Sequence, residues 1–427
     1  MQIYRQNELK KLLELLSERA ENISPEIMKT VADVITDVRK NGDRALHEYT
    51  EKFDKVKLES LFVSEEEQER LIEKVPDDLK EVIDEAAENI YKFHQKQLQN
   101  SWMMNENGKI LGQIVRPIEK VGLYVPGGTA AYPSSVLMNA IPAKVAGVRE
   151  VTIVTPPKLE GINPAVVYAA KKAGITEIVS VGGAQAIAAL AYGTESIKRV
   201  DKIVGPGNIF VAMAKKLVFG TVDIDMIAGP SEVLVIADER ANPIYVAADL
   251  MSQAEHDPMA AAILITTSEE LAKKVCAEIE IQKAALQRNT IIDRSLEKYG
   301  SIILVENLND AVEISNEIAP EHLELAVDNP FELLTLVKNA GSIFLGDNAP
   351  EPLGDYFAGP NHVLPTNGTA RFSSALGVDS FIKKSSYLYY DSESLQKVGA
   401  KVIKFAEAEG LGAHANSIRK RLEQDAK

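Results

Sequence analysis

The chain contains 427 residues, of which 45% are hydrophobic, and this length accommodates about two or three domains. A formal net charge of −15 argues against a protein that binds nucleic-acid backbones, although it does not exclude a small cationic substrate. We find no apolar run of about eighteen residues, so we expect no transmembrane helix. The N-terminus has no apolar segment typical of a secretory signal, and the single cysteine, Cys276, excludes an intramolecular disulfide and fits a reducing, cytoplasmic environment.

Residues 1 to about 100 are rich in Lys and Glu and favour helices. Ser24 and Pro25 are typical of a helix N-terminus, and apolar residues at helical spacing follow until the Asn-Gly-Asp sequence at 41–43 ends the pattern. A second helix is expected from Asp77 to Gln99. We interpret this region as scaffold, and we expect its His94 to be a surface residue.

Residues 101–217 change to strands that alternate with helices. The pair Asn107-Gly108, between two apolar stretches, predicts a β-hairpin. Strands are then expected at 121–125, 151–155, 178–181 and 202–204, each followed by a helix, at 134–148, 163–173, 184–192 and 209–217. Such alternation implies right-handed crossovers and a parallel sheet.

Three glycine-rich loops follow these strands, at 126–128, 182–183 and 205–208. We expect them at the carboxyl edge of the sheet, where open α/β sheets hold nucleotides. Glycines permit close approach of the backbone, and helix N-termini favour phosphate. The Gly-x-Gly-x-x-Gly pattern is absent, because Phe210 stands where its last glycine would be. Glycine-rich turns also occur without ligands, so the pattern alone leaves nucleotide binding open.

Residues 225–350 predict a second α/β unit, with strands at 233–237, 261–266, 301–305 and 342–346 and helices at 268–287 and 308–318. From about residue 376 the chain is expected to be helical, with an amphipathic pattern at 394–407. The sequence therefore predicts an α/β protein with two Rossmann-like parallel-sheet units and helical N-terminal and C-terminal segments.

Gln253 and His256 form the first candidate for a metal site. They lie at positions i and i+3 of an expected helix that ends near Pro258, so their side chains share one face. An amide oxygen and an imidazole nitrogen could form half of a site, and residues 352–356 and 409–414 could supply the other half. A match of two residues is weak, so an ordinary helix end stays the alternative.

Glu321 and His322 form a candidate acid/base pair. Pro320 predicts a helix start, which places both residues in the first turn, where the helix dipole stabilises a carboxylate and disfavours an imidazolium. A neutral His beside an ionised Glu could transfer protons near neutral pH. The alternative is a helix N-terminus with a chance His. We interpret His362 as structural or as a partner of the ligands, and Cys276, on an amphipathic helix, as an inert thiol.

Seven motifs together resemble the histidinol dehydrogenase family, and the resemblance extends over essentially the whole chain. They are Tyr-Val-Pro-Gly-Gly at 124–128, Val-Gly-Gly-Ala-Gln-Ala-Ile-Ala-Ala-Leu at 181–190, Gly-Pro-Gly-Asn at 205–208, Ala-Gly-Pro-Ser-Glu-Val-Leu at 228–234, Ser-Gln-Ala-Glu-His at 252–256, Pro-Glu-His-Leu-Glu at 320–324 and Glu-Gly-Leu-x-x-His at 409–414.

The resemblance implies an enzyme with one Zn²⁺ per subunit that oxidises L-histidinol through L-histidinaldehyde to L-histidine with two NAD, as the last step of histidine biosynthesis. The zinc ligands of the family match Gln253, His256, Asp355 and His414. Its acid/base pair matches Glu321 and His322, and its NAD contacts match Tyr124, Gln185 and Asn208. Its substrate contacts match Ser231, Glu409 and His322 together with the four zinc ligands.

The resemblance also implies a homodimer in which the C-terminal segment of one subunit, with Glu409 and His414, completes the active site of its partner. We expect helical dimerisation segments at 1–24 and 376–427, a larger α/β domain with the metal and acid/base residues at 25–120 and 232–375, and a smaller NAD-binding domain at 121–231. No nucleic-acid or membrane partner is expected. The alternatives are a metal-dependent hydrolase on the same framework and a non-catalytic nucleotide-binding protein.

Overall fold

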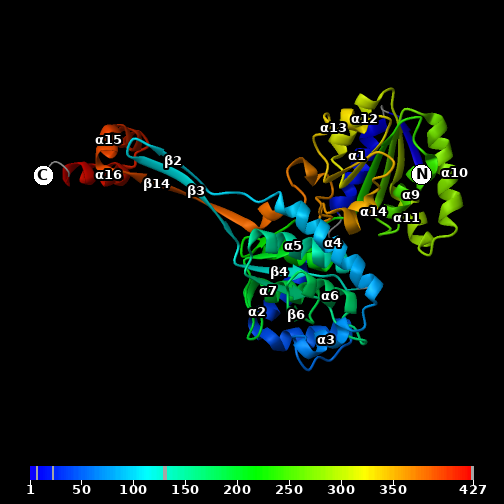
Figure 1. Cartoon of the computed structure of the whole chain (residues 1–427), viewed down its shortest axis with the longest axis horizontal. Helices are drawn as coiled ribbons and strands as arrows, with labels where there is room; N and C mark the ends of the chain where they lie inside the picture. The colour runs from blue at the N-terminus through cyan, green and yellow to red at the C-terminus, as the bar shows by residue number, and fades with distance from the viewer. Residues whose placement is uncertain (6–7, 22–23, 128–131, 425–427) are drawn as a thin grey trace. The chain divides into compact units, whose positions relative to one another are not determined.

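The computed structural model describes residues 1–5, 8–21, 24–127 and 132–424, so Gly128 of the first glycine loop lies outside the described residues. Contacts divide the chain into two units, residues 1–97 with 118–381 and residues 98–117 with 382–427. Figure 1 labels their helices and strands. No helix in the described part of the chain is long and apolar enough to span a bilayer.

The first unit contains a parallel sheet of six strands in the order β1-β11-β10-β9-β12-β13. The strands are β1 (Gln2–Arg5), β9 (Glu232–Ala237), β10 (Ala261–Thr266), β11 (Gly300–Leu304), β12 (His322–Ala326) and β13 (Ser342–Leu345). Strands β9, β10 and β12 are buried along their whole length. Such continuous burial is typical of a parallel sheet with helices on both faces.

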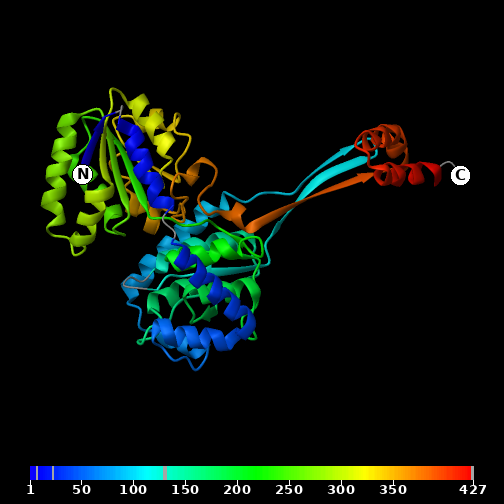
Figure 2. The same cartoon turned by 180° about the vertical axis from the view of Figure 1, so that it is seen from behind.

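Helices cover both faces of this sheet (Figures 1 and 2). They are α1 (Leu9–Glu21), α9 (Pro243–Ala254), α10 (Glu269–Lys283), α11 (Asn289–Tyr299), α12 (Leu308–Ile318), α13 (Pro330–Leu334) and the short α14 (Glu351–Leu353). Val233 and Val235 of β9 belong to the core with α9, α10 and α11, whereas Leu234 and Ile236 belong to the core with α1, α12 and α13. Alternate residues of β9 therefore pack into apolar cores on opposite faces of the sheet.

The first unit also contains a parallel sheet of five strands in the order β6-β5-β4-β7-β8. The strands are β4 (Lys120–Tyr124), β5 (Glu150–Val154), β6 (Glu177–Val179), β7 (Lys202–Val204) and β8 (Asp223–Ile224). The connecting helices are α5 (Pro133–Ala146), α6 (Pro164–Lys172), α7 (Gly183–Tyr192) and α8 (Ile209–Val218). The parallel sheets predicted from the alternating pattern are therefore confirmed.

Three N-terminal helices complete the layers of the five-stranded sheet: α2 (Pro25–Asp54), α3 (Glu65–Ile72) and α4 (Asp77–Gln95). Helix α2 shares a core with α7 and α8, and α4 shares one with α5 and α6. As predicted, Ser24 caps α2 by accepting from the N–H of Glu26, and Gly42 interrupts the helix at φ 51°. The sequence hypothesis instead groups residues 25–120 with the other domain, because an amphipathic pattern does not reveal which sheet a helix covers.

The second unit is an antiparallel sheet with two helices. Its strands are β2 (Trp102–Glu106), β3 (Lys109–Pro117) and β14 (Ile382–Tyr390), in the order β14-β3-β2, and its helices are α15 (Ser392–Ala408) and α16 (Gly412–Gln424). The predicted hairpin between β2 and β3 is confirmed, and both of its turn residues have positive φ, 41° at Asn107 and 80° at Gly108. Such values are typical of a two-residue hairpin turn.

Three sequence expectations are wrong. Residues 382–390 form a strand rather than a helix, because they pair with β3 along their whole length. The N-terminal segment contributes β1 to the six-stranded sheet, where Gln2–Arg5 pair with β11. His94 is fully buried, and its Nδ1 lies 2.8 Å from Oε1 of Gln97.

Three short helical turns connect the remaining parts of the first unit. They are the π-helix η2 (Gly354–Ala358) and the 3₁₀ turns η3 (Thr369–Arg371) and η4 (Val378–Phe381). The π-helix follows α14 directly, and it carries Asp355. π-Helices are rare and occur frequently at functional sites, so this position makes Asp355 a candidate functional residue.

Candidate functional site

The candidate metal and acid/base residues gather at the amino edge of the six-stranded sheet. His322 is the first residue of β12, and it is paired in register with Val233 of β9 and Ser342 of β13. Gln253 is near the C-terminus of α9, which returns to this edge. Helix C-termini carry partial negative charge and favour cations, whereas the carboxyl edge of such a sheet presents helix N-termini that favour anions. The location therefore suits a metal ion.

Glu321 and His322 do not lie in the first turn of a helix, so that prediction is wrong. Ala319 ends α12 in the left-handed region at φ 54°, and the chain then enters β12, where residues 322–326 are all buried. The Glu321 carboxylate accepts a hydrogen bond from the N–H of Glu232 at 2.8 Å. Nδ1 of His322 lies 3.0 Å from the carbonyl oxygen of Glu232 and 3.7 Å from Oε2 of Glu321. The two predicted acid/base residues are therefore adjacent and held by one peptide segment of β9.

Burial and neighbouring charges change the acidity of this pair. Burial raises the pKa of Glu321 to about 8, against the opposing effect of a positive His322. Burial disfavours the charged form of His322, but the carboxylates of Glu321, Asp355 and Glu351 outweigh it and raise the His322 pKa to about 10. The sequence predicted an ionised Glu321 and a neutral His322 from a helix dipole. Without a metal ion, this environment does not favour those two forms. A bound cation beside them lowers both pKa values.

Gln253 is the second buried polar residue of the site, with a side chain only 1% exposed. Its Nε2 donates to the carbonyl oxygen of Glu232 at 3.2 Å and lies 3.0 Å from Nδ1 of His322. Its Oε1 has no hydrogen-bond partner among the described residues, and the same holds for Nε2 of His322. Buried polar atoms are rarely left unpaired in native proteins, so both atoms are candidates for contact with a ligand.

His322, Glu351 and Asp355 form the cluster that could hold a cation. One ligand atom from each lies within 4.8 Å of the other two. Nε2 of His322 is 3.5 Å from Oδ1 of Asp355. Burial favours the neutral form of Asp355, but His322 outweighs it and keeps the Asp355 pKa below its ordinary value. Carboxylate oxygens and an imidazole nitrogen suit several divalent metals, Zn²⁺ among them.

Glu351 is the member of this cluster that the sequence did not indicate. Its carboxylate accepts from the hydroxyl of Ser252 at 2.7 Å, and its backbone N–H donates to Oε1 of Glu324 at 2.8 Å. The side chain is only 2% exposed. The signal that could have identified it is its position four residues before Asp355, which places both carboxylates on one face of a continuous helical segment.

The other predicted ligands are less closely gathered. His256 lies in the turn after α9, with an exposed side chain. Ser231 is half-buried next to β9, and its carbonyl oxygen accepts from the N–H of Ala261. Glu409 and His414 belong to the second unit, where both side chains are exposed.

His362 connects the segment of Asp355 to α5. Its Nδ1 lies 2.9 Å from the carbonyl oxygen of Asp355, and its Nε2 lies 3.3 Å from Oγ of Ser135. Burial lowers the pKa of His362, so its neutral form can use one ring nitrogen as donor and the other as acceptor. This geometry agrees with the interpretation of His362 as a residue that supports the site.

The three predicted cofactor contacts line a single pocket of about 850 Å³ in the first unit. Tyr124 ends β4, Gln185 lies in the first turn of α7, and Asn208 caps α8 by accepting from the N–H groups of Phe210 and Val211. The pocket is thus at the carboxyl edge of the five-stranded sheet, next to helix N-termini, which favours a phosphate-containing ligand.

Tyr124 is oriented for hydrogen bonding within this pocket. Its hydroxyl oxygen accepts from the N–H of Gly183 at 3.1 Å. Burial raises the pKa of Tyr124 to about 12, so its hydroxyl keeps its proton at neutral pH and can act as a donor.

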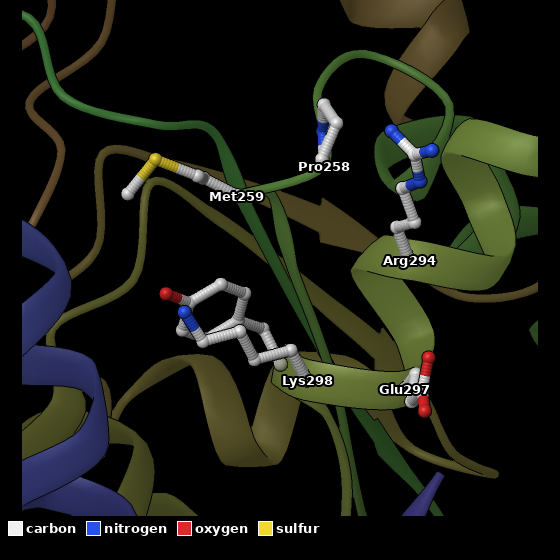
Figure 3. Close-up of a pocket in the computed structure, with 6 residues that line it drawn as sticks. Pro258, Met259, Arg294, Glu297 and Lys298 are labelled. Carbon is white, nitrogen blue, oxygen red and sulfur yellow. The ribbon is translucent and has the colours of Figure 1, made fainter.

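A second hollow, of about 510 Å³, lies beside α11. It is lined by Pro258, Met259, Arg294, Glu297, Lys298 and Tyr299, and Figure 3 shows these side chains on α11 and on the loop after α9. Nζ of Lys298 lies 5.0 Å from the centre of the Tyr299 ring, so these two lining side chains contact each other. None of the residues assigned above to the site lines it.

Comparison with known proteins identifies histidinol dehydrogenases as relatives of this chain. The histidinol dehydrogenase family profile matches residues 17–422. The histidinol dehydrogenase of Clostridium acetobutylicum is 60% identical over 414 residues, which cover 96% of each chain, and that of Lactococcus lactis is 53% identical over 427 residues, 99% of each. The crystal structure of histidinol dehydrogenase from Elizabethkingia anophelis is 42% identical and superposes with a TM-score of 0.95, covering 100% of this chain and 99% of that one.

The resemblance inferred from the seven motifs is therefore confirmed at the level of the whole chain. The fold and the profile extend across both parallel sheets and the C-terminal unit. The chain belongs to the histidinol dehydrogenase family, and it is an oxidoreductase of histidine biosynthesis.

Proposed function

We propose that this chain catalyses two successive NAD-linked oxidations of L-histidinol, through L-histidinaldehyde to L-histidine, and that it requires zinc. Each oxidation transfers one hydride to NAD⁺, and the second also consumes one water, so both electron pairs leave as NADH. The observation that carries the proposal is the buried arrangement of Gln253, Glu321 and His322 beside Asp355 at one sheet edge. It combines metal-ligating atoms with an acid/base pair.

The donor atoms present fit a zinc ion. Oε1 of Gln253 and Nε2 of His322 are buried without partners among the described residues, and His322 lies in the cluster with Glu351 and Asp355. We assign the ligands to Gln253, His256, Asp355 and His414. A Zn²⁺ held by two imidazoles, one carboxylate and one neutral amide retains positive charge, and it supplies Lewis acidity toward the substrate oxygen and nitrogen atoms.

Glu351 has a supporting role in this assignment. Its carboxylate is close to His322 and Asp355 and is oriented by the Ser252 hydroxyl. Carboxylates behind the direct ligands commonly orient them and contribute to metal affinity. Ser252 precedes Gln253, so the same hydrogen bond also ties the end of α9 to α14.

We assign NAD to the pocket at the carboxyl edge of the five-stranded sheet. Tyr124, Gln185 and Asn208 all line it, and its volume of about 850 Å³ lies in the range of small-molecule and cofactor sites. These three residues would hold NAD⁺ there, and the bound NAD⁺ would supply the hydride acceptor for both oxidations.

His322 and Glu321 carry the proton transfers. In the alcohol step His322 accepts the hydroxyl proton as the hydride leaves the carbon, because an alcohol cannot lose hydride alone. In the aldehyde step Glu321 accepts a proton from the water that adds to the carbonyl, and the hydrate formed is then the hydride donor. The hydrogen bond from the N–H of Glu232 orients the Glu321 carboxylate for this function.

Substrate binding is assigned to Ser231, His322 and Glu409 together with the four zinc ligands. We assign Glu409 and His414 to the active site of a second subunit, so the active form is a homodimer. The second unit supports this assignment, since it exposes large apolar side chains: Trp102, Met103, Leu388, Tyr389 and Phe405 are each at least half exposed. Exposed apolar surface of this extent is typical of a protein interface.

The domain assignment follows from these roles. We assign dimerisation to residues 376–427, metal and acid/base chemistry to 232–375 and NAD binding to 121–231, with α2 and α4 packed on the sheet of the NAD-binding part. A cytoplasmic location agrees with NAD as co-substrate and with the free thiol of Cys276.

The experiment that tests the function mixes the purified protein with NAD⁺ and L-histidinol and follows reduced nicotinamide by absorbance. We expect two NADH per histidinol consumed, loss of the reaction after treatment with a chelator, and recovery on addition of Zn²⁺. One NADH per histidinol would contradict the two-step proposal. Chelator-sensitive cleavage of esters or amides without NAD would instead support the hydrolase alternative.

A further inference from the structure

The loop at 205–208 determines how two residues of the NAD pocket are placed relative to each other. Gly205 adopts φ +107°, and a Cβ built on it would lie 2.1 Å from the carbonyl oxygen of Tyr124. The loop backbone therefore lies directly against the end of β4. Asn208, three residues later, caps α8 and lines the same pocket. A small shift at Gly205 would change the distance between Tyr124 and Asn208.

Two buried charged side chains hold the polar groups of Gly205. Oδ2 of Asp225 accepts from the Gly205 N–H at 2.8 Å, and Nζ of Lys215 donates to the Gly205 carbonyl oxygen at 2.9 Å. Lys215 and Asp225 also form an ion pair with each other. Their side chains are only 2% and 1% exposed. Asp225 accepts in addition from the N–H of Met226 at 2.6 Å, which fixes its own orientation.

Stability alone does not explain a buried ion pair at this position. Transferring two charges from water into a protein interior costs free energy, and apolar pairs of similar size are often equally or more stabilising. The geometry here instead satisfies both backbone hydrogen-bonding groups of Gly205. A fully satisfied buried network of this kind rigidifies the segment that it contacts.

We propose that Lys215 and Asp225 are positioning residues that fix the 205–208 loop, so that Asn208 and Tyr124 together contact the dinucleotide. The inference rests on the proposed assignment of NAD to this pocket. Neither side chain lines the pocket, so the pair acts through the backbone of Gly205 and not through the cofactor. Its loss should therefore weaken NAD binding while it leaves histidinol and zinc binding unchanged.

The chain offers a control pair on strands β7 and β8, in which one side chain is buried and the other is half exposed. Lys202 of β7 and Asp223 of β8 are register partners, and their side chains form an ion pair at 2.9 Å. The Lys202 side chain is 8% exposed, so it is also largely buried. This pair joins β7 to β8, whereas the Lys215–Asp225 pair joins α8 to the residue after β8. Among the described residues only the latter pair is hydrogen-bonded to the 205–208 loop.

The test compares two double variants of the full-length, zinc-loaded protein, Lys215→Met/Asp225→Asn and Lys202→Met/Asp223→Asn. Removing both charges together avoids an unpaired buried charge. Circular dichroism and zinc content first establish that each variant folds. For Lys215→Met/Asp225→Asn we expect the KM for NAD⁺ and the Kd for NADH to rise about tenfold, with the Kd measured by fluorescence titration. A tenfold change corresponds to the loss of roughly one well-placed hydrogen bond to the dinucleotide. The KM for histidinol and the zinc content should stay within about twofold, and the control should change none of these quantities beyond that.

Two results would overturn the positioning role. One is an equal Kd for NADH in the two double variants. The other is a rise in the KM for histidinol as large as the rise in the KM for NAD⁺, because such a result indicates general damage to the protein. If the double variant does not fold, Lys215→Gln/Asp225→Asn provides the comparison, since it also removes both charges and so leaves no unpaired buried charge. An unchanged Kd in that variant also overturns the role.

A third variant separates this inference from the assignment on which it rests. Asn208→Ala removes a residue that lines the pocket itself. If Asn208→Ala weakens NADH binding but the Lys215 and Asp225 variants do not, the pocket assignment stands and the positioning role fails. If Asn208→Ala leaves NADH binding unchanged, the pocket assignment fails first.

Discussion

The side-chain nitrogen of Gln253 lies 3.0 Å from Nδ1 of His322, and both atoms lie within hydrogen-bonding distance of the carbonyl oxygen of Glu232. The proposed metal ligand and the proposed base therefore share one backbone acceptor. Because Nε2 of Gln253 donates to that carbonyl, its Oε1 is the atom left free to face a cation. The metal site and the proton-transfer site are thus parts of one hydrogen-bonded arrangement.

Gln253→Leu should lower the affinity for zinc by about 10- to 100-fold, because it removes a ligand oxygen and a contact that orients His322. The measurement is the zinc retained against a series of chelator concentrations. Gln282→Leu is the control, since Gln282 lies on α10 and its side chain bonds the carbonyl oxygen of Ile244. Equal zinc retention in both variants would exclude Gln253 as a ligand.

Glu321→Gln should slow aldehyde oxidation by about 10²- to 10⁴-fold and alcohol oxidation considerably less, because only the aldehyde step needs a base for water. The two steps are assayed separately, with L-histidinol and with L-histidinaldehyde as the starting substrate. Glu306→Gln, at an exposed position after β11, should leave both rates unchanged. Equal losses in the two steps would show that Glu321 is not the base specific to the second one.

The sequence allowed much of this fold to be predicted because the relevant signals are local. Strands followed by glycine turns and helices recur along residues 121–217, and the Ser24 cap and the Asn107-Gly108 turn each depend on a few adjacent residues. The three NAD contacts that the family resemblance implies lie within these local motifs. Each lies at the start of a helix or the end of a strand, which places them at one sheet edge.

The errors arise where the deciding interaction is distant in sequence. Residues 382–390 contain strand-favouring Ile and Tyr but no regular alternation of apolar and polar residues, and β3, more than 250 residues earlier, provides the pairing partner. His322 begins a strand rather than a helix because β9 and β13 flank it. Glu351 was missed although it lies four residues before Asp355, because that spacing alone does not show burial, and its neighbours Ser252 and His322 come from other elements.

Cys276→Ala should leave both oxidations within about twofold of the wild-type rates. The thiol lies half-buried on α10, and burial raises its pKa, so little of the reactive thiolate forms at neutral pH. The same argument predicts slow reaction with a disulfide reagent near pH 8, compared with free cysteine. Selective loss of aldehyde oxidation in Cys276→Ala would indicate a covalent thiohemiacetal and would contradict the role given to Glu321.

Arg19→Met should destabilise the protein strongly. The Arg19 guanidinium pairs with the buried carboxylate of Glu232 and also donates to the carbonyl oxygen of Met259 at 3.1 Å. Without it Glu232 is left buried and unpaired, which costs about 3–5 kcal/mol. Arg240→Met is the control, because its pair with Asp328 at 2.7 Å is about two-thirds exposed and contributes about 0–1 kcal/mol.

Calorimetry measures this difference as a shift in Tm. For a chain of this size Arg19→Met should lower Tm by about 3–6 °C, and Arg240→Met by no more than about 1 °C. A similar small shift in both variants would mean that Glu232 is neutral in the native protein and does not depend on Arg19. Since the N–H of Glu232 orients Glu321, we also expect Arg19→Met to slow the aldehyde step more than the alcohol step.

Asp249→Asn should make the stability of the metal-free protein less dependent on pH. Burial, together with the charges of Glu351 and Asp347, raises the pKa of Asp249 from 3.8 to about 6, and Glu324, which shares a hydrogen bond with it, has a pKa well above its ordinary value. A carboxyl group with a raised folded-state pKa stabilises the fold below its unfolded pKa, and that contribution is lost as the pH rises through the folded value. The wild-type protein should therefore lose stability between about pH 4 and pH 7.

Over that window Tm of Asp249→Asn should fall less, while Asp33→Asn, on the exposed face of α2, should follow the wild type. Parallel Tm curves for the wild type and Asp249→Asn would show that Asp249 ionises normally in the folded protein. They would also show that the carboxyl groups of Asp249 and Glu324 do not share a proton.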